Sequence, residues 1–282
     1  MDELSSTAPQ ALPVPRFKRH FSEFIGIGDN GHLWVEGRDC EELADTFGTP
    51  LHVISENQFR HSYRRFRDAF QSQYPNVEIL FANKSNNGLA MRHIMNQEGA
   101  GGDCFGYNEM YVALLAGSDP TKMALNGSNK EADEIELAIA NGVCVNLDAM
   151  DELDMVDETA RRLGVEAEVG IRVKLELPGL VDRHSTGVHH GSMAEIVAGE
   201  KWGMSYAQTA ELAKRIRETM KHLHLTELNF HLSRLDNQAC DFAEMARDMV
   251  RWSARLRDDL GWTPSCLDLG GGWVFGRKEK TG

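Results

Sequence analysis

The feature that most constrains the fold is a regular alternation of short apolar segments with helix-like segments through the middle of the chain. The apolar segments recur roughly every 20–25 residues, at 77–83, 102–105, 122–126, 143–147 and 167–173. Segments with helical patterning lie between them, at 89–97, 108–116, 131–141 and 150–163. A glycine follows each helical segment where helices usually stop, namely Gly99, Gly117, Gly142 and Gly164. The apolar segments are short and show no polar alternation, which is typical of parallel strands covered on both faces.

The same alternation continues more loosely toward the end of the chain. Residues 177–203 form a polar stretch rich in glycine and histidine, which is long enough to suggest a functional loop. A helix, a sixth strand, a long helix and a seventh strand are predicted after it, at 205–220, 225–232, 237–260 and 267–269. Seven such strands predict an α/β fold, a (β/α)8 TIM-type barrel without its eighth strand.

The beginning of the chain follows a different pattern. Residues 1–16 are rich in Ser, Pro and Ala and have no apolar signal core, so we expect a flexible tail. Residues 17–35 contain two short β-like pieces, and Asp39 begins a short helix. A brief strand is predicted at 51–54. Ser55 then caps a helix with an aromatic face made of Phe59, Tyr63, Phe66 and Phe70.

Residues with useful chemistry follow or end six of the seven predicted strands. They are Lys84, Asp103, 126–128, Arg172, His231, Ser233, Gly270, Gly271 and Gly272. In barrels of this kind the functional groups lie at the C-terminal ends of the strands. We therefore expect these residues to converge on one mouth although they are far apart in the sequence.

Lys84 is the candidate nucleophile, because it follows the apolar residues 79–82 directly. An ammonium group is costly to bury without a partner. Partly dry surroundings would lower the pKa of Lys84 and free its amine to attack a carbonyl group, as a Schiff-base lysine does. The same stretch also fits a surface lysine that happens to follow a strand.

A lysine, an imidazole and a glycine-lined loop at one mouth suit a phosphorylated aldehyde such as pyridoxal phosphate. Glycine lets the backbone approach closely, so the N–H groups of 270–272 would hold a phosphate. His231 would stack on the cofactor ring. Each signal also has a plainer interpretation, since a glycine triplet is often a turn and a lone histidine is often a core residue. His189 and His190 are adjacent and predict no metal site.

Composition excludes several classes of function. The chain is 41% hydrophobic and 26% charged, and no apolar run is long enough to span a bilayer. Its net charge of −13 argues against a nucleic-acid partner. The cysteines are odd in number and scattered without CxxC spacing, as in a cytoplasmic protein with reduced thiols and no zinc site: Cys40, Cys104, Cys144, Cys240 and Cys266.

From about residue 38 to residue 272 the sequence resembles the fold-type III pyridoxal-phosphate decarboxylases, which share the alanine racemase-like barrel. The resemblance is greatest to the diaminopimelate branch of the diaminopimelate and ornithine decarboxylases. It rests on motifs in the family's order and spacing, at 42–44 with 48–53, 81–86, 102–104 with Glu109, 172–173, 201–203 and 267–272.

The resemblance implies a role for each candidate residue. Lys84 would bond the cofactor, His231 would stack on its ring, and the backbone of Gly270, Gly271 and Gly272 would contact phosphate. Asp103, Glu109 and Arg172 would give polar support around the lysine and the ring. The family has glycine and serine two and three residues after the histidine, where this chain has Ser233 and Arg234. A phosphate-binding serine is therefore shifted to Ser233, or Arg234 replaces it.

By the same resemblance we expect a cytoplasmic protein that acts on a small amino acid, and a homodimer if a full-length form exists. The expected reaction is decarboxylation of meso-diaminopimelate to L-lysine in lysine biosynthesis. The expected domains are a tail (1–16), a β segment that joins a β-domain (17–37) and a pyridoxal-phosphate barrel (38–282). The family continues with a strand bearing Glu-Pro-Gly-Arg and then the β-domain. Neither occurs in these 282 residues, so we expect a fragment or split gene product that is inactive alone.

Two alternatives to diaminopimelate decarboxylation remain open at this point. One is a non-catalytic barrel protein that binds or carries pyridoxal phosphate. The other is a decarboxylase of ornithine, lysine, arginine or a related diamino acid.

Overall fold

The computed structural model describes three stretches of the chain, residues 17–180, 193–232 and 239–273. The chain divides into two compact units, Met1–Ile79 with Gln97–Gly99 and Leu80–Asn96 with Ala100–Gly282. The predicted assignment of residues 17–37 to a β segment and 38–282 to the barrel stays a prediction. No helix of the described stretches is long and apolar enough to cross a membrane.

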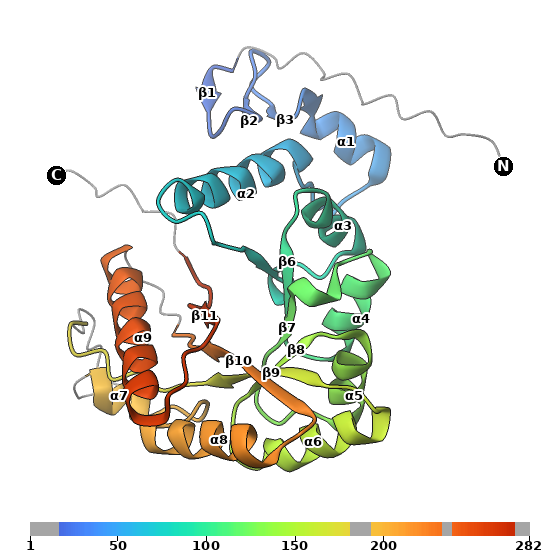
Figure 1. Cartoon of the computed structure of the whole chain (residues 1–282). Coiled ribbons are helices and arrows are strands. Elements are labelled where there is room, and N and C mark those ends of the chain that lie inside the picture. Colours follow the sequence, from blue (N-terminus) through green and yellow to red (C-terminus); the bar gives the residue numbers. More distant parts are fainter. Residues whose placement is uncertain (1–16, 181–192, 233–238, 274–282) are drawn as a thin grey trace. The chain divides into compact units, whose positions relative to one another are not determined.

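The first unit holds a small antiparallel sheet and two helices (Figure 1). Its strands pair in chain order, each with the next. The elements are β1 (Arg19–His20), β2 (Ile25–Ile27), β3 (Leu33–Val35), β4 (Arg38–Asp39), α1 (Cys40–Phe47) and α2 (Glu56–Gln71). Both predicted helix starts are confirmed. Asp39 accepts the N–H of Glu41 (2.9 Å), and Ser55 accepts that of Gln58 (3.0 Å).

Residues 51–54 do not form the strand that the sequence predicts. Leu51, Val53 and Ile54 are 38%, 42% and 50% exposed, and no strand of the described stretches pairs with this segment. Apolar and β-branched residues favour a strand only where a neighbour completes the hydrogen-bond ladder and a face is covered.

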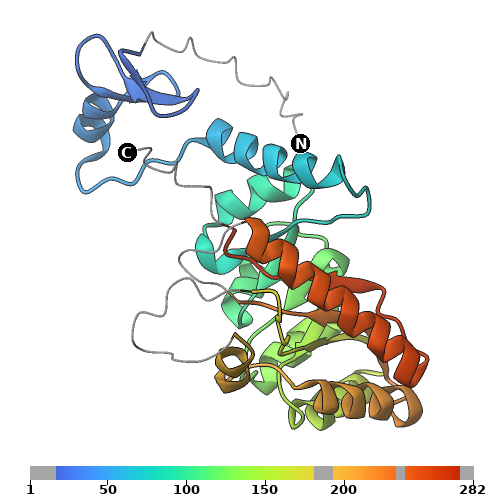
Figure 2. The same ribbon diagram turned by 90° about the vertical axis from the view of Figure 1, so that its left-hand side faces the viewer.

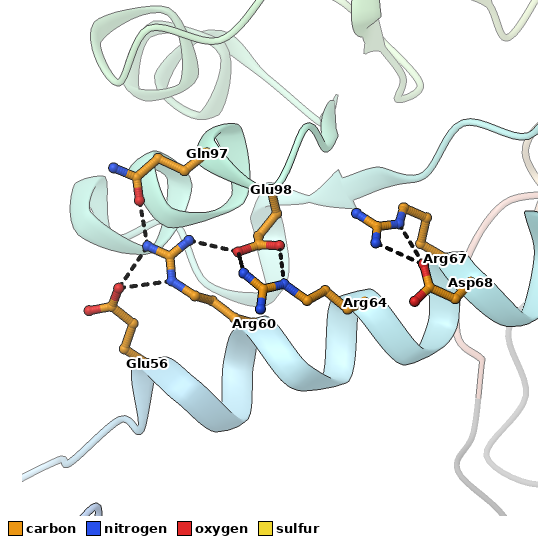
Figure 3. Close-up of polar contacts among 7 residues, drawn as sticks. All are labelled: Glu56, Arg60, Arg64, Arg67, Asp68, Gln97 and Glu98. Atoms are coloured by element: carbon orange, nitrogen blue, oxygen red, sulfur yellow. Dashed lines mark hydrogen bonds and ion pairs between the residues drawn. The ribbon is translucent and has the colours of Figure 1, made fainter. Parts of the chain in front are cut away.

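Two arginines of α2 bind Gln97–Gly99, a short segment that comes later in the sequence but belongs to this unit (Figure 3). Arg60 Nη1 and Arg64 Nε lie 2.8 and 2.6 Å from the carboxylate oxygens of Glu98. Arg60 also pairs with Glu56 one turn earlier, at 2.7 Å, and donates to Gln97. The hydrogen bonds from Arg64 and Arg60 hold the pKa of the Glu98 carboxyl below its usual value.

The second unit is built on a parallel sheet of seven strands. The strands lie side by side in the order of the sequence, as successive strand–helix units require. They are β5 (Leu80–Ala82), β6 (Gly101–Cys104), β7 (Met123–Leu125), β8 (Cys144–Leu147), β9 (Ala167–Arg172), β10 (Leu223–Asn229) and β11 (Cys266–Asp268). The predicted barrel architecture with seven strands is confirmed, although individual strands begin or end a few residues from the predicted bounds.

Helices cover the outer face of this curled sheet (Figures 1 and 2). They are α3 (Leu89–Gln97), α4 (Tyr107–Leu115), α5 (Ala132–Asn141), α6 (Glu152–Leu163), α7 (Met193–Gly199), α8 (Tyr206–Thr219) and α9 (Ala239–Leu260). Gly142 and Gly164 end α5 and α6 with φ of 78° and 70°, as predicted. The sequence pattern misses α7, because the glycines and histidines of the stretch 177–203 outweigh one short apolar turn.

The strands have two chemically different faces, since side chains alternate along a strand. On the side of the helices they are apolar and buried, as at Val145, Leu147, Val169 and Ile171. The positions between these lie inside the curl and are mostly polar: Asp103, Asn146, Gly170, Arg172, Glu227, Asn229 and Asp268. The expectation of strands without polar alternation is therefore wrong for β8, β9 and β10.

Candidate functional site

Lys84 lies in a short 3-10 turn, η1 (Asn83–Ser85), that follows β5. The turn is anchored by Asn83, whose buried amide donates to Cys104 Sγ (3.2 Å) and to the carbonyl oxygen of Glu109 (3.3 Å). Lys84 is exposed, which agrees with the surface lysine that the sequence also allowed and not with partly dry surroundings. Its Nζ stands 4.2 Å from the centre of the Phe105 ring, because the strand ends before the lysine and the turn carries its side chain outward.

Asp103 and Glu109 supply negative charge near this lysine. Asp103 on β6 accepts a hydrogen bond from Asn126 Nδ2 (2.8 Å). Glu109, in the first turn of α4, accepts the N–H of Phe105 (2.8 Å). Burial raises the pKa of the Glu109 carboxyl and the charge of Asp103 adds to the rise, whereas the charge of Lys84 opposes it.

Arg172 ends β9 and is 3% exposed. Its Nη1 lies 3.5 Å from Asp148 Oδ1, and its guanidinium carbon lies 5.4 Å from the centre of the Trp202 ring. Burial lowers the pKa of this guanidinium, and the charges of Asp148, Asp103 and Asp268 counteract the fall. The Nε–H group is buried without a hydrogen-bond partner in the described stretches.

His231 follows β10 by two residues and is held as a neutral ring. Its Nδ1 accepts the N–H of Gly271 (3.1 Å), which places the ring proton on Nε2. Burial lowers the pKa of His231 to about 4, and the nearby charges of Lys84 and Arg172 contribute. The imidazole is therefore uncharged at pH 7, which suits stacking on an aromatic ring.

The glycine triplet forms a turn against His231. Gly270 has a φ of +66°, and an added Cβ would lie 2.7 Å from His231 Nδ1 and from the carbonyl oxygen of Phe230. Only glycine fits there. The N–H of Gly270 donates to Asp268 Oδ1 (2.7 Å), and that of Gly271 donates to His231. Two of the three amides predicted to hold phosphate are thus already hydrogen-bonded, and phosphate binding at 270–272 stays a prediction.

Ser233 and Arg234 lie outside the described residues, so their predicted phosphate contacts also stay predictions. The other predicted site residues lie on or just after strands β5, β6, β9, β10 and β11 of one sheet. The charges of Lys84 and Arg172 both lower the pKa of His231, so both side chains lie near its ring. No group of three or more His, Cys, Asp or Glu side chains in the described stretches is arranged to hold a metal ion.

Further polar residues line the inside of the curl and escape the sequence analysis. Asp148 directly follows β8, and the strand-end rule, applied to the fourth strand, would have found it. Asn146 and Asn229 fill inner positions of β8 and β10, each 1–2% exposed. Several buried atoms here have no hydrogen-bond partner in the described stretches, namely Asn126 Oδ1, Asn146 Oδ1, Asp148 Oδ1, Arg172 Nε and Asn229 Oδ1. Such atoms usually bind water or a ligand.

Two carboxyl groups lie side by side in the same interior. Glu227 accepts a hydrogen bond from Asn146 Nδ2 (2.7 Å), and the two side chains meet over Gly170 of the intervening strand. Burial, reinforced by the charge of Asp268, raises the pKa of Glu227 to about 7. Burial also raises the pKa of Asp268, which accepts Asn229 Nδ2 at 2.7 Å.

The arrangement fits a flat anionic aldehyde. Lys84 offers an accessible amine, His231 offers a neutral ring, and Arg172 offers an unpaired N–H donor. In the described stretches nothing lies within 4 Å of the position that a Cβ at Gly271 would occupy, so these residues leave space beside the glycine turn.

Comparison with known families agrees with this fit. The pyridoxal-dependent decarboxylase family, pyridoxal binding domain, matches residues 57–281. The chain therefore belongs to the pyridoxal-dependent decarboxylases, as the motifs predicted.

Diaminopimelate decarboxylases are among the similar proteins of that family. The one from Methanothermobacter thermautotrophicus is 36% identical over 179 residues, which is 63% of this chain and 40% of the relative. The one from Methanocaldococcus jannaschii is 28% identical over 250 residues, 86% of this chain and 55% of the relative. The chain thus spans about half the length of the curated relatives it matches.

Solved structures show the same barrel. The diaminopimelate decarboxylase of M. jannaschii superposes with a TM-score of 0.81 at 26% identity, over 92% of this chain and 59% of the other. The same enzyme in complex with L-lysine gives a TM-score of 0.78 at 24% identity, over 91% of this chain and 59% of the other. This second likeness is evidence for the fold alone.

Proposed function

We propose that this chain holds pyridoxal phosphate through Lys84 and is the cofactor-binding part of a decarboxylase that converts meso-diaminopimelate to L-lysine. The observation that carries the proposal is an accessible lysine after β5, a buried arginine at the end of β9 and a neutral histidine after β10, with both cations near enough to lower the pKa of the histidine. The diaminopimelate decarboxylases among its relatives support this substrate over ornithine or arginine.

The cofactor, when bound, supplies an electron sink for the carbon–carboxylate bond that breaks. Each residue of the chain has a separate task in holding it. The amine of Lys84 would bond the aldehyde carbon with release of water, and Asp103 and Glu109 would offset the positive charge of the lysine. The neutral imidazole of His231 covers one face of the ring, and the free Nε–H of Arg172 binds an anionic oxygen.

Borohydride trapping tests the role of Lys84. The chain is incubated with pyridoxal phosphate, reduced with sodium borohydride, digested and analysed by mass spectrometry. We expect the added mass on the peptide that contains Lys84, and its loss in Lys84→Ala. Lys214→Ala, which removes an exposed lysine from α8, is the control and should label like the wild type. Cofactor on another lysine, or on none, would contradict the proposal.

Release of CO2 tests the reaction. The loaded chain is assayed with meso-diaminopimelate, ornithine, lysine and arginine, and the proposed substrate predicts that any CO2 released comes from the first. Release from another substrate alone would overturn the substrate assignment. Cofactor bound at Lys84 without release from any of the four would limit the function to cofactor binding. The proposal includes a cytoplasmic homodimer, and sedimentation of the loaded chain tests the dimer.

A further inference from the structure

A chain of four buried charges connects the ends of three neighbouring strands. Lys130 lies in the loop after β7, Asp148 follows β8 and Arg172 ends β9, while Glu152 begins α6. The exposed fraction is 5% for Lys130, 4% for Asp148, 3% for Arg172 and 6% for Glu152. Two are basic and two are acidic, so the group can be neutral as a whole even though each charge is costly to bury alone.

The first half of this series of charges is an ion pair that also forms hydrogen bonds with the backbone. Lys130 Nζ donates to Glu152 Oε2 and Oε1 at 3.0 and 3.2 Å, and to the carbonyl oxygen of Gly127 at 2.7 Å. The same Oε2 atom accepts the backbone N–H of Asp148 at 2.7 Å. The carboxylate of Glu152 therefore ties the loop after β7 to the residue that follows β8.

The second half is the contact between Asp148 and Arg172. Asp148 Oδ1 lies 3.5 Å from Arg172 Nη1, which is an ion pair without a formed hydrogen bond. The face of Trp202 lies 5.4 Å from the same guanidinium. Arg172 is thus held at one edge and on one face, while its Nε–H stays unpaired in the described stretches.

We propose that Lys130 and Glu152 are positioning residues that set the guanidinium of Arg172 through Asp148. Neither needs to touch a ligand. Glu152 fixes the backbone of Asp148, Asp148 sets where the guanidinium lies, and Lys130 holds the Glu152 side chain in place. The effect on cofactor affinity rests on the proposed function, whereas the effect on Arg172 and His231 does not.

Loss of this support should weaken cofactor binding without removing any cofactor contact. Displacement of a binding group by about 1 Å costs on the order of a hundredfold in well-organised sites, and loss of a supporting partner costs about tenfold to a hundredfold. We expect Lys130→Met and Glu152→Gln each to raise the Kd for pyridoxal phosphate by about tenfold or more. The double variant removes both charges, so it should fold better than either single variant while still failing to position Asp148.

An exposed ion pair that also involves α6 gives a matched control. Arg162 of α6 lies 2.7 Å from Glu136 of α5, and the two side chains are 52% and 46% exposed. Arg162→Met, Glu136→Gln and their combination should leave both the Kd and the state of Arg172 unchanged. A third test variant, Asp148→Asn, keeps the backbone N–H and removes only the charge that faces Arg172.

Two measurements on the chain without cofactor separate positioning from general damage. One is the side-chain Nε–H signal of Arg172 by NMR, which should broaden or shift in the test variants. The other is the pKa of His231 by NMR titration, which Arg172 helps to hold near 4 and which should rise when the guanidinium moves away. Unfolding curves and amide spectra recorded in parallel show whether each variant is folded.

The outcomes are distinguishable. Folded variants with a shifted Arg172 signal, a raised His231 pKa and a weakened Kd support the proposal. Folded variants whose Arg172 Nε–H signal and His231 pKa match those of the wild type overturn it. If Lys130→Met and Glu152→Gln do not fold, Asp148→Asn decides by the same criteria. If borohydride trapping fails at Lys84 in the wild type, the proposed function fails, yet the two cofactor-free measurements still judge the positioning role.

Discussion

The two faces of the parallel sheet are made by the same strands but follow different rules. On the outer face, residues such as Leu147 and Ile171 are fully buried against the helices. One residue away on each strand, Asp148 and Arg172 face the interior as charged groups with unpaired atoms. The outer face resembles an ordinary protein core, whereas the inner face retains polar atoms that cost stability where nothing binds them.

This difference indicates a division of labour within each strand. Burial of apolar area on the outer face stabilises the fold. The inner face carries groups that lower stability, and proteins retain such groups mainly where they serve a function. Four substitutions test whether the two faces separate in this way.

Leu147→Ala should have the largest effect on stability, because it removes buried volume from the outer face. We expect the free energy of unfolding to fall by about 2–5 kcal/mol, measured by urea denaturation. Trapping of cofactor at Lys84 should persist under conditions where the variant is folded. A loss below 1 kcal/mol would show that the outer face is not the main source of stability.

Glu227→Gln should stabilise the chain in alkaline solution and thereby reveal the cost of the inner face. Burial raises the folded-state pKa of Glu227 to about 7, well above its usual value, so the unfolded chain ionises first. The free energy of unfolding is therefore undiminished by this group at low pH, and it falls as the pH rises toward 8. The variant should gain up to about 3 kcal/mol over the wild type at pH 8 and little at pH 4.5. Unfolding curves at both pH values measure this, and equal gains at both would refute the assignment.

Gly170→Ala should destabilise the inner face by crowding. Its new Cβ would overlap Asn146 Oδ1 and lie 3.0 Å from Glu227 Cβ. We expect a loss of about 1–3 kcal/mol. Adding Asn146→Ala should restore part of that loss in the same denaturation assay, and a double variant no better than the single one would place the strain elsewhere.

Val250→Thr should have the smallest effect, because it changes the solvent side of a helix whose other side packs on the sheet. Val250 on α9 is 57% exposed, whereas its neighbour Met249 is fully buried. Valine and threonine are both β-branched, so we expect the free energy of unfolding to change by no more than about 0.5 kcal/mol. A larger change would show that something covers this side of α9.

The outer face and the strand ends could be predicted from the sequence, because both depend on local pattern. Apolar segments of regular spacing predicted the strands, and the residues just after them included Lys84, Arg172 and His231. Asp148 obeys the same rule after the fourth strand. The sequence left the exposure of Lys84 open, since this exposure depends on a 3-10 turn that ends β5 after Ala82.

The inner face could not be predicted, because its contacts depend on register. Asn146 and Glu227 are 81 residues apart in sequence and meet only across β9. In β10 a bulge between Leu225 and Glu227 shifts the register. Counting by twos from Leu225 would therefore place Glu227 on the wrong side of the sheet.

The absence of a side chain at Gly170 also has a consequence for the evolution of the chain. The side chains of Asn146 and Glu227 occupy the space above this glycine, so the three positions share one small volume. A mutation that introduces a side chain at 170 can become fixed only after 146 or 227 has become smaller. Among relatives of this chain, we expect these three positions to change together and in a restricted order.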